Sequence, residues 1–351
     1  MRNTIKRSTF FTKILQWEFW PFTLFYFPIL LYWLWLSIKA RSFFFFSASN
    51  PSIETGGMMG ESKIRILEQI PEAYLPKTFF VKAGEDITAL NRKLISFNIS
   101  YPLIAKPDVG ERGRMVEKIK NAQEMESYLR LIRVDFIVQE FIGYPLELGI
   151  FYVRYPDETT GKVTSIVIKD FLKVIGDGQS TILELMKNYP RAAFQLARLG
   201  PKLGGLAEHI PATGEVVDLE PIGNHARGTT FLNGNDLIDQ HLNEVFDSIS
   251  KQIPGFYYGR YDLKCTSIED LKLGKNIKIM ELNGAGAEPA HIYHPHSSLL
   301  LAYKALFSHW RMLYEVSKQN HKHGIPYMSF SEARKKYKEV KEYQKVLLNN
   351  G

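Results

Sequence analysis

The sequence predicts an α+β fold in which helices cover antiparallel sheets. Strand-like apolar stretches alternate with amphipathic helical stretches along the 351 residues. Two pairs of apolar stretches are each joined by a turn, 147–156 with 162–171 and 259–268 with 276–285, and each pair predicts a β-hairpin. Because hairpins join antiparallel strands, these observations argue against a doubly wound parallel sheet.

The composition is that of a globular protein, with 45% hydrophobic and 23% charged residues. The length predicts two or three compact units. The net charge of +7 is concentrated at the two ends, because residues 1–41 carry +5 and residues 315–351 carry +4. The positive net charge is therefore not evidence of a nucleic-acid-binding surface, and we expect no nucleic-acid partner. One cysteine, Cys265, excludes an intramolecular disulfide.

Residues 19–38 contain no charged side chain and are long enough to span a bilayer as a helix. Two prolines interrupt the stretch, and its many Trp and Tyr residues favour the headgroup region over the hydrocarbon centre. Cations precede and follow it, which favours a segment lying in the cytoplasmic face of a membrane. A spanning helix, and an aromatic helical hairpin packed on the protein itself or on a partner subunit, remain the alternatives.

Four regions follow from these patterns. Residues 1–41 form the basic, aromatic segment, and residues 42–85 open with a short buried strand and a Gly-rich loop. Residues 86–300 hold alternating strand and helix patterns, and residues 301–351 form a mostly helical C-terminal extension.

Acidic and amide side chains lie on the second predicted hairpin. Glu281 and Asn283 are two apart on one strand and share a face, and Asp262 on the partner strand can converge with them. Oxygen ligands of this kind suit Mg²⁺ bound to nucleotide phosphates. Arg260 shares the face of Asp262 and could stabilise developing negative charge. The alternative for each acidic residue is a solvated outward face.

Lys106 ends an apolar strand and is followed by a loop with Gly110 and Gly113. A lysine there can reach phosphate oxygens while backbone amides of the loop surround them. The loop matches neither of the common nucleotide-binding glycine patterns, and a surface turn is the alternative.

The order of these motifs resembles that of the ATP-grasp superfamily, which includes D-alanine–D-alanine ligase. The motifs are, in order, YPLIAKP, the glycine loop, FIVQEFIGYPLEL, the first hairpin, Arg260 with Asp262, and Glu281 with Asn283. The resemblance covers roughly residues 60–300. It implies two α+β subdomains with antiparallel sheets that enclose the nucleotide. It also implies that residues 86–300 are the catalytic domain, and that residues 42–85 are a reduced form of the N-terminal, substrate-side domain that such ligases usually carry. Because that domain helps to select the substrate, the resemblance does not identify the substrate.

The resemblance also implies roles for individual residues. Lys106 and Lys169 would contact the ATP phosphates, with Lys106 and Arg260 as catalytic cations, and the loop 110–114 would close over them. The hinge that receives adenine would be Gln139, Glu140, Phe141 and Ile142, and Glu147 would hold the ribose. Magnesium, replaceable by Mn²⁺, would bind to Asp262, Glu281 and Asn283.

Two further segments are similar to cyanophycin synthetase and glutathione-forming ligases. The first is VIGDGQSTILEL from Val174, although a Gly-Asp-Gly turn and a helix cap at Ser180 or Thr181 explain it locally. The second is a loop in which Asn224, His225 and Arg227 would border the substrate, with Arg227 on a carboxylate. A plain surface loop is the alternative for the second segment.

We therefore expect an ATP- and magnesium-dependent ligase that joins a small carboxylate to an amine, or to a thiol, through an acyl phosphate. An ATP-grasp kinase without ligation and an inactive membrane-associated scaffold are the competing functions. We expect a cytoplasmic protein that associates with the membrane face, with homo-oligomers allowed.

Overall fold

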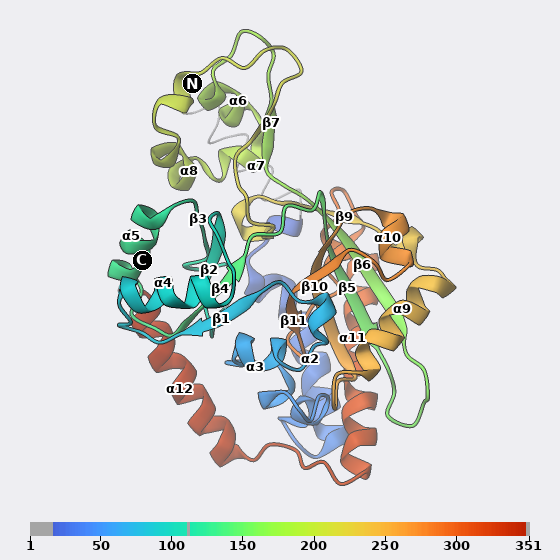
Figure 1. Cartoon of the computed structure of the whole chain (residues 1–351). Coiled ribbons are helices and arrows are strands. Elements are labelled where there is room, and N and C mark those ends of the chain that lie inside the picture. Colours follow the sequence, from blue (N-terminus) through green and yellow to red (C-terminus); the bar gives the residue numbers. More distant parts are fainter. Residues whose placement is uncertain (1–16, 111–112, 349–351) are drawn as a thin grey trace.

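The structure, a computed structural model, describes residues 17–110 and 113–348. It is a mixed α+β fold whose sheets are antiparallel, and it includes one N-terminal apolar helix, as predicted. Figure 1 shows a smaller sheet and a larger sheet side by side, with a small third unit beyond them.

The smaller sheet carries the predicted lysine strand. Its order is β1-β4-β2-β3, and its strands are Thr78–Val81, Phe136–Glu140, Leu103–Pro107 and Glu117–Ile119 in that order. Two helices, α4 (Ile87–Ser96) and α5 (Ala122–Leu131), pack on this sheet. Each begins at a side-chain cap, Asp86 for α4 and Asn121 for α5, which satisfies a free backbone amide of the first turn.

The larger sheet contains both predicted hairpins. Its order is β11-β10-β5-β6-β9, and its strands are Ile277–Asn283, Tyr258–Cys265, Leu146–Val153, Lys162–Asp170 and Thr230–Asn233 in that order. In the second hairpin Asp262 lies opposite Glu281, and Arg260 lies opposite Asn283. A short helix, α10 (Ile268–Lys272), fills the connection between these two strands.

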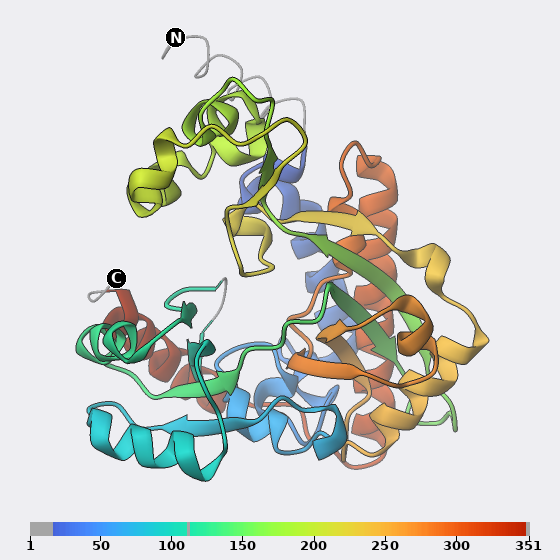
Figure 2. The same ribbon diagram turned by 45° about the horizontal axis from the view of Figure 1, so that its top comes forward.

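Helices bury both faces of the larger sheet, which explains why β5 is continuously apolar from Leu148 to Val153. Ile150 and Tyr152 belong to the core formed with α9 (Gln240–Lys251). Phe151 and Val153 point the other way and belong to the core formed with α11 (Leu299–Lys322). Figure 2 shows these helices on opposite sides of the sheet, with α2 beside α11.

The third unit is inserted between β6 and β9. A two-stranded ribbon, β7 (Lys173–Ile175) with β8 (Val216–Asp218), packs with α6 (Ile182–Asn188), α7 (Pro190–Ala193) and α8 (Leu196–Leu203). Thr181 and Glu184 form a capping box at the start of α6, so the predicted helix cap is confirmed.

The N-terminal apolar stretch forms one helix, α2 (Phe22–Ala40), and continues through Pro28. The helical hairpin considered for this segment is therefore wrong. One side of α2 packs on α11, where Phe25 and Ile29 contact the core around Leu306. By length and composition α2 is the one helix among the described residues that could cross a membrane, and 22% of its most apolar window is buried.

The segment after α2 differs from the prediction of a short strand. Residues 45–48 form a 3₁₀ turn, η2 (Phe45–Ala48), and η3 (Glu54–Gly56) follows it. Phe45 and Phe46 are buried against α11 without a strand partner, so apolar character alone did not distinguish a strand from a packed turn. Further short helices in the described chain are η1 (Trp17–Phe19), α3 (Lys63–Leu67), η4 (Glu72–Tyr74), η5 (Gly204–Glu208), η6 (His225–Arg227), η7 (Asn235–Leu237) and η8 (Ala290–Tyr293).

The C-terminal extension is helical, as expected, and its last helix is α12 (Phe330–Leu348). Lys336 pairs with Glu54 at 2.6 Å near one end of α12, and Leu347 belongs to the core of the smaller sheet at the other end. The helix thus runs from η3 to the smaller sheet (Figure 1). The predicted domain limits at 41, 85 and 300 stay predictions.

The buried histidine of α11 makes stability depend on pH. His309 is 5% exposed, and burial lowers its pKa to about 4. Between pH 6.5 and pH 4 the unfolded chain therefore binds a proton that the folded chain does not, so stability falls as the pH falls. We expect His309→Gln to reduce the loss of unfolding free energy between pH 7 and pH 5 by about 2 kcal/mol.

Chemical denaturation at the two pH values checks this expectation. Parallel losses in wild type and variant would contradict it.

Candidate active site

A cavity of about 690 Å³ lies between the smaller sheet, the larger sheet and the start of α2. The predicted site residues that line it are Lys106, Gly110, Gly113, Gln139, Phe141, Ile142, Glu147, Lys169, Asn224, His225, Arg260, Asp262, Glu281 and Asn283. The fold therefore brings together side chains that are up to 177 positions apart in the sequence.

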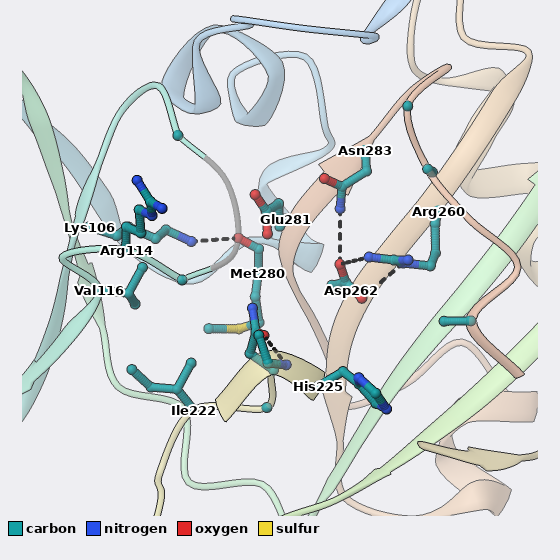
Figure 3. Close-up of a pocket in the computed structure, with 18 of the residues that line it drawn as sticks. Lys106, Arg114, Val116, Ile222, His225, Arg260, Asp262, Met280, Glu281 and Asn283 are labelled. Carbon is teal, nitrogen blue, oxygen red and sulfur yellow. Dashed lines mark hydrogen bonds and ion pairs between the residues drawn. The ribbon is translucent and has the colours of Figure 1, made fainter. Parts of the chain in front are cut away.

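Strands β10 and β11 place the acidic residues on one face, as the two-residue spacing predicted. Asn283 Nδ2 donates to Asp262 Oδ2 at 2.9 Å, and Arg260 donates to both oxygens of the same carboxylate, at 3.2 and 2.9 Å. Figure 3 shows these side chains and Glu281 gathered around one space. Burial alone would raise the pKa of Asp262, but Arg260 and Lys169 outweigh it and hold this pKa at about 2.

Two lysines face the acidic residues, Lys169 from β6 of the same sheet and Lys106 from β2 of the smaller sheet. Lys169 Nζ on β6 lies 3.0 Å from Glu147 Oε1 and 3.1 Å from Asp262 Oδ1. Burial alone would lower the pKa of Lys169, but the two carboxylates outweigh it and raise this pKa, so the side chain stays charged. The network joins β5, β6 and β10 through charges that are almost fully buried.

Lys106 reaches the cavity from the smaller sheet. Its ammonium donates to the side chain of Gln139 at 3.1 Å and to the carbonyl of Met280 at 3.0 Å (Figure 3). Burial lowers the pKa of Lys106 to about 8, although nearby carboxylates act against the shift. The side chain thus joins the two sheets across the cavity.

The side chains of the predicted hinge, which follows β4, do not all face the cavity. Gln139, Phe141 and Ile142 line the cavity. Glu140 is not among the described lining residues, and its carboxylate accepts from the backbone amide of Lys77 at 2.9 Å. Neighbouring side chains on a strand point to opposite faces, so Glu140 must turn away where Gln139 turns in. The carboxylate is thus not placed where the sequence analysis expected it.

The glycine loop is held from two sides. Gly113 has a φ of +68°, a region that favours glycine. Lys63 donates to the carbonyl of Gly110 at 2.7 Å and lies 3.5 Å from Glu281. Residues 111 and 112 of the predicted loop fall outside the described residues.

Arg227 reaches the glycine loop instead of the cavity. Its guanidinium donates to the carbonyl of Gly113 and, at 3.1 Å, to that of Val116, and it lies 3.5 Å from Glu220. Arg227 is not among the described lining residues, in contrast to Asn224 and His225. The expected contact between Arg227 and a substrate carboxylate therefore has no support in this arrangement.

Two lining lysines were not assigned a role from the sequence. Lys264 donates to the carbonyl of Ile142 at 3.1 Å and lies 3.9 Å from Glu147. Side chains two apart on a strand share a face, so the argument that linked Arg260 to Asp262 also links Lys264 to Asp262, and Lys264 could have been predicted. Lys63 gave no such signal, because its contact with Glu281 links distant parts of the chain.

Side chains from residues 17–26 form a wall of the cavity that the sequence did not indicate. Trp17, Phe25 and Tyr26 line it with Glu18. Glu18 binds Arg191 at 2.7 Å and lies 3.4 Å from His225, so it connects this wall to the third unit. The apolar segment thus contributes to the cavity as well as to the surface.

Comparisons with known proteins include likenesses to solved structures of low sequence identity. No family model and no curated protein matches the sequence. Three similar solved structures are D-alanine–D-alanine ligase from Bacillus anthracis (15% identity over 77% of this chain and 70% of that one, TM-score 0.44), VanG D-Ala:D-Ser ligase from Enterococcus faecalis (17%, 74% and 61%, 0.41) and bifunctional glutathione synthetase from Pasteurella multocida (16%, 70% and 36%, 0.37).

These three are ATP-grasp ligases, the superfamily that the sequence motifs resemble. The chain spans little more than a third of the glutathione synthetase and less than two thirds of the VanG ligase. TM-scores below 0.5 carry no argument about the reaction, so the reaction has to follow from the chain's own side chains.

The contact of Arg227 with the glycine loop can be tested directly. We expect Arg227→Ala to increase the rate of trypsin cleavage at Arg114 by about tenfold, because the loop loses hydrogen bonds from a charged donor. Limited proteolysis followed by mass spectrometry measures this rate. Arg65→Ala, at an exposed arginine, is the control. Unchanged cleavage in Arg227→Ala would show that the contact does not order the loop.

Proposed function

We propose that the chain is an ATP-dependent ligase that activates a carboxylate as an acyl phosphate and transfers the acyl group to an amine. The observation that carries this proposal is the convergence of Arg260, Asp262, Glu281 and Asn283 in one cavity with Lys106 and Lys169. Cations and oxygen ligands on facing walls suit a nucleotide triphosphate and its metal. A scaffold would have no need of this buried charge, whose desolvation costs several kcal/mol per ion.

In this proposal the cavity divides into a nucleotide side and a reaction side. Adenine lies at the hinge of Gln139, Phe141 and Ile142, and the ribose lies at Glu147. Lys106 and Lys169 bind the phosphates beneath the loop 110–114. Asn224 and His225 border the substrates at the other side of the cavity.

The donor set fits magnesium by its chemistry. Asp262, Glu281 and Asn283 offer hard oxygen atoms on one face of a hairpin, although the described residues contain no cluster of three His, Cys, Asp or Glu side chains that could hold a metal ion. Magnesium would neutralise phosphate charge there. Arg260 and Lys169 already balance Asp262, so each added anion would meet a preorganised set of cations.

The reaction has two steps. An oxygen of the substrate carboxylate attacks the γ-phosphorus of ATP, and the bond to ADP breaks, which yields an acyl phosphate and ADP. The amine nitrogen then attacks the acyl carbon, the carbon–oxygen bond to phosphate breaks, and the nitrogen loses a proton. Arg260 lies where it can balance the charge that develops on the transferred group.

Hydroxylamine trapping tests the acyl phosphate. With ATP, magnesium and a panel of amino acids and dicarboxylic acids, we expect ADP and a hydroxamate in equal amounts with one carboxylate. Glu281→Gln should lower both by at least about a hundredfold. Glu281 is 34% exposed, and its partner Lys63 keeps the hydrogen bond to the carbonyl of Gly110, so this variant should disturb the fold less than Asp262→Asn, which removes the partner of two buried cations.

Glu269→Gln, at an exposed carboxylate of α10, is the matched control and should keep full activity. ADP without hydroxamate would indicate a kinase instead. No turnover with any carboxylate would count against an active enzyme.

We further propose that α2 attaches the protein to the cytoplasmic face of a membrane. The helix is apolar on all sides, but only one side packs on α11. The opposite side exposes Leu24, Phe27, Leu31, Trp35 and Ile38, which are between 49% and 75% exposed and repeat at helical spacing. Lys39 lies over the Trp35 ring at 4.5 Å, so a cation accompanies the exposed aromatic side chains. Apolar residues flanked by cations suit an anionic lipid surface.

Flotation with vesicles tests this attachment. We expect the full chain to float with vesicles of phosphatidylcholine and phosphatidylglycerol, and the triple variant Leu24→Ser, Leu31→Ser and Ile38→Ser to bind at least about tenfold more weakly. Ile95→Ser with Leu273→Ser, at exposed apolar residues far from α2, is the control. A wild type that stays unbound would contradict the proposal, and a lipid-free dimer lost in the triple variant would assign the face to self-association.

A further inference from the structure

One carboxylate in the cavity, that of Glu288, is held by two tyrosine hydroxyls. Glu18, Glu147, Asp262 and Glu281 each lie within 3.5 Å of a cationic side chain. Glu288 also lines the cavity, but no ion pair of its carboxylate is found among the described residues. Its two oxygens accept from neutral groups, the hydroxyls of Tyr26 and, at 2.9 Å, Tyr293.

The hydroxyls hold the carboxylate without neutralising it. Burial, together with the charge of Glu288, raises the pKa of Tyr26 and of Tyr293 far above the ordinary tyrosine value. Both tyrosines therefore remain protonated donors at any physiological pH. Each carboxylate oxygen keeps a second acceptor position, because one oxygen can accept two hydrogen bonds.

Further aromatic rings pack against the two tyrosines that hold this carboxylate. Trp17 stacks on Phe25 at 4.9 Å, and its ring lies 5.8 Å from Tyr293. Phe25 in turn lies edge-on to Tyr26 at 5.3 Å. Aromatic faces attract cations, and a carboxylate among such rings adds a formal negative charge. This combination is the chemistry that recognises an ammonium group.

The same cluster adjoins the reaction side of the cavity. Arg260 donates to the backbone carbonyl of Glu288 at 3.1 Å and to the Asp262 carboxylate at 2.9 Å. The Arg260 guanidinium thus contacts the backbone of Glu288 while its ionic partner is Asp262. Arg260, which we assign to the transferred group, thus links the aromatic cluster to Asp262, which we assign to magnesium.

We propose that Glu288, Tyr26, Tyr293 and the rings of Trp17 and Phe25 form the binding site for the primary ammonium group of the acceptor. The assignment of this group to an acceptor rests on the ligase function proposed above, whereas binding of an ammonium group does not. Tyr26 belongs to α2, so the N-terminal helix supplies part of the substrate site.

Saturation-transfer NMR with three probes of similar shape tests the site without turnover. The probes are n-butylammonium, uncharged n-butanol and butyltrimethylammonium, added to the full chain with magnesium and a non-hydrolysable ATP analogue. We expect butylammonium to bind at least about tenfold more tightly than butanol, and Glu288→Gln to remove this difference. Tyr26→Phe keeps the ring and should weaken butylammonium binding less than Glu288→Gln.

Glu72→Gln, at an exposed carboxylate of η4, is the matched control and should bind the probes as wild type does. A thermal melt establishes that Glu288→Gln is folded. Equal binding of butylammonium and butanol, or no butylammonium binding in wild type, would overturn the proposal. Preference for butyltrimethylammonium would replace a primary amine by a quaternary one and overturn it equally.

The NMR result is independent of the hydroxamate assay. Selective binding of butylammonium without ATP turnover would keep the ammonium site and remove the ligase. Turnover with hydroxylamine but without ammonium selectivity would keep the ligase and place the acceptor elsewhere.

Discussion

The site depends on pairing charges that the fold has removed from water. Asp262 and Lys169 have side chains only 9% and 7% exposed, and they lie 3.1 Å apart on strands that do not neighbour each other. Leaving either one unpaired would cost several kcal/mol, so the strands between them are constrained to one register. Glu147 and Arg260 complete the balance. The ion pairs that line the cavity therefore also fix the strand register of the larger sheet.

The spacing of residues along the sequence was sufficient to predict the parts of the site that lie on strands. The two hairpins and the shared face of Arg260 and Asp262 follow from spacing alone, because side chains alternate along a strand. The same alternation explains why Glu140 turns away from the cavity beside Gln139. The fold class was predictable for this reason, and so was the placement of the lysine strand.

Local patterns failed where contacts join distant segments. Tyr26 and Glu288 are 262 positions apart, and no spacing rule connects them. The short strand expected after α2 is a packed turn, since burial against α11 replaces a strand partner for Phe45. Residues of the predicted substrate-side region 42–85, such as Lys63 and Ile66, line the cavity, but so do Trp17 and Tyr26 from the segment before it, which the sequence did not indicate. The composition of that segment showed its apolar character but not which side chains point inward.

Helix α12 has a consequence for how the cavity opens. It joins the core of the smaller sheet through Leu347 and meets η3 through Lys336 and Glu54, so it connects two bodies that also meet across the cavity. Tyr343 adds a hydrogen bond to the carbonyl of Asp135 at the smaller sheet, 3.1 Å away. A motion that separates the two sheets would have to break the Lys336–Glu54 ion pair and the ring contacts of Phe330, or move α12 with one of the sheets. Because Phe330 at the start of α12 packs against Phe43 and Phe44, and Leu347 near its end packs in the core of the smaller sheet, the helix limits how far the two sheets can separate.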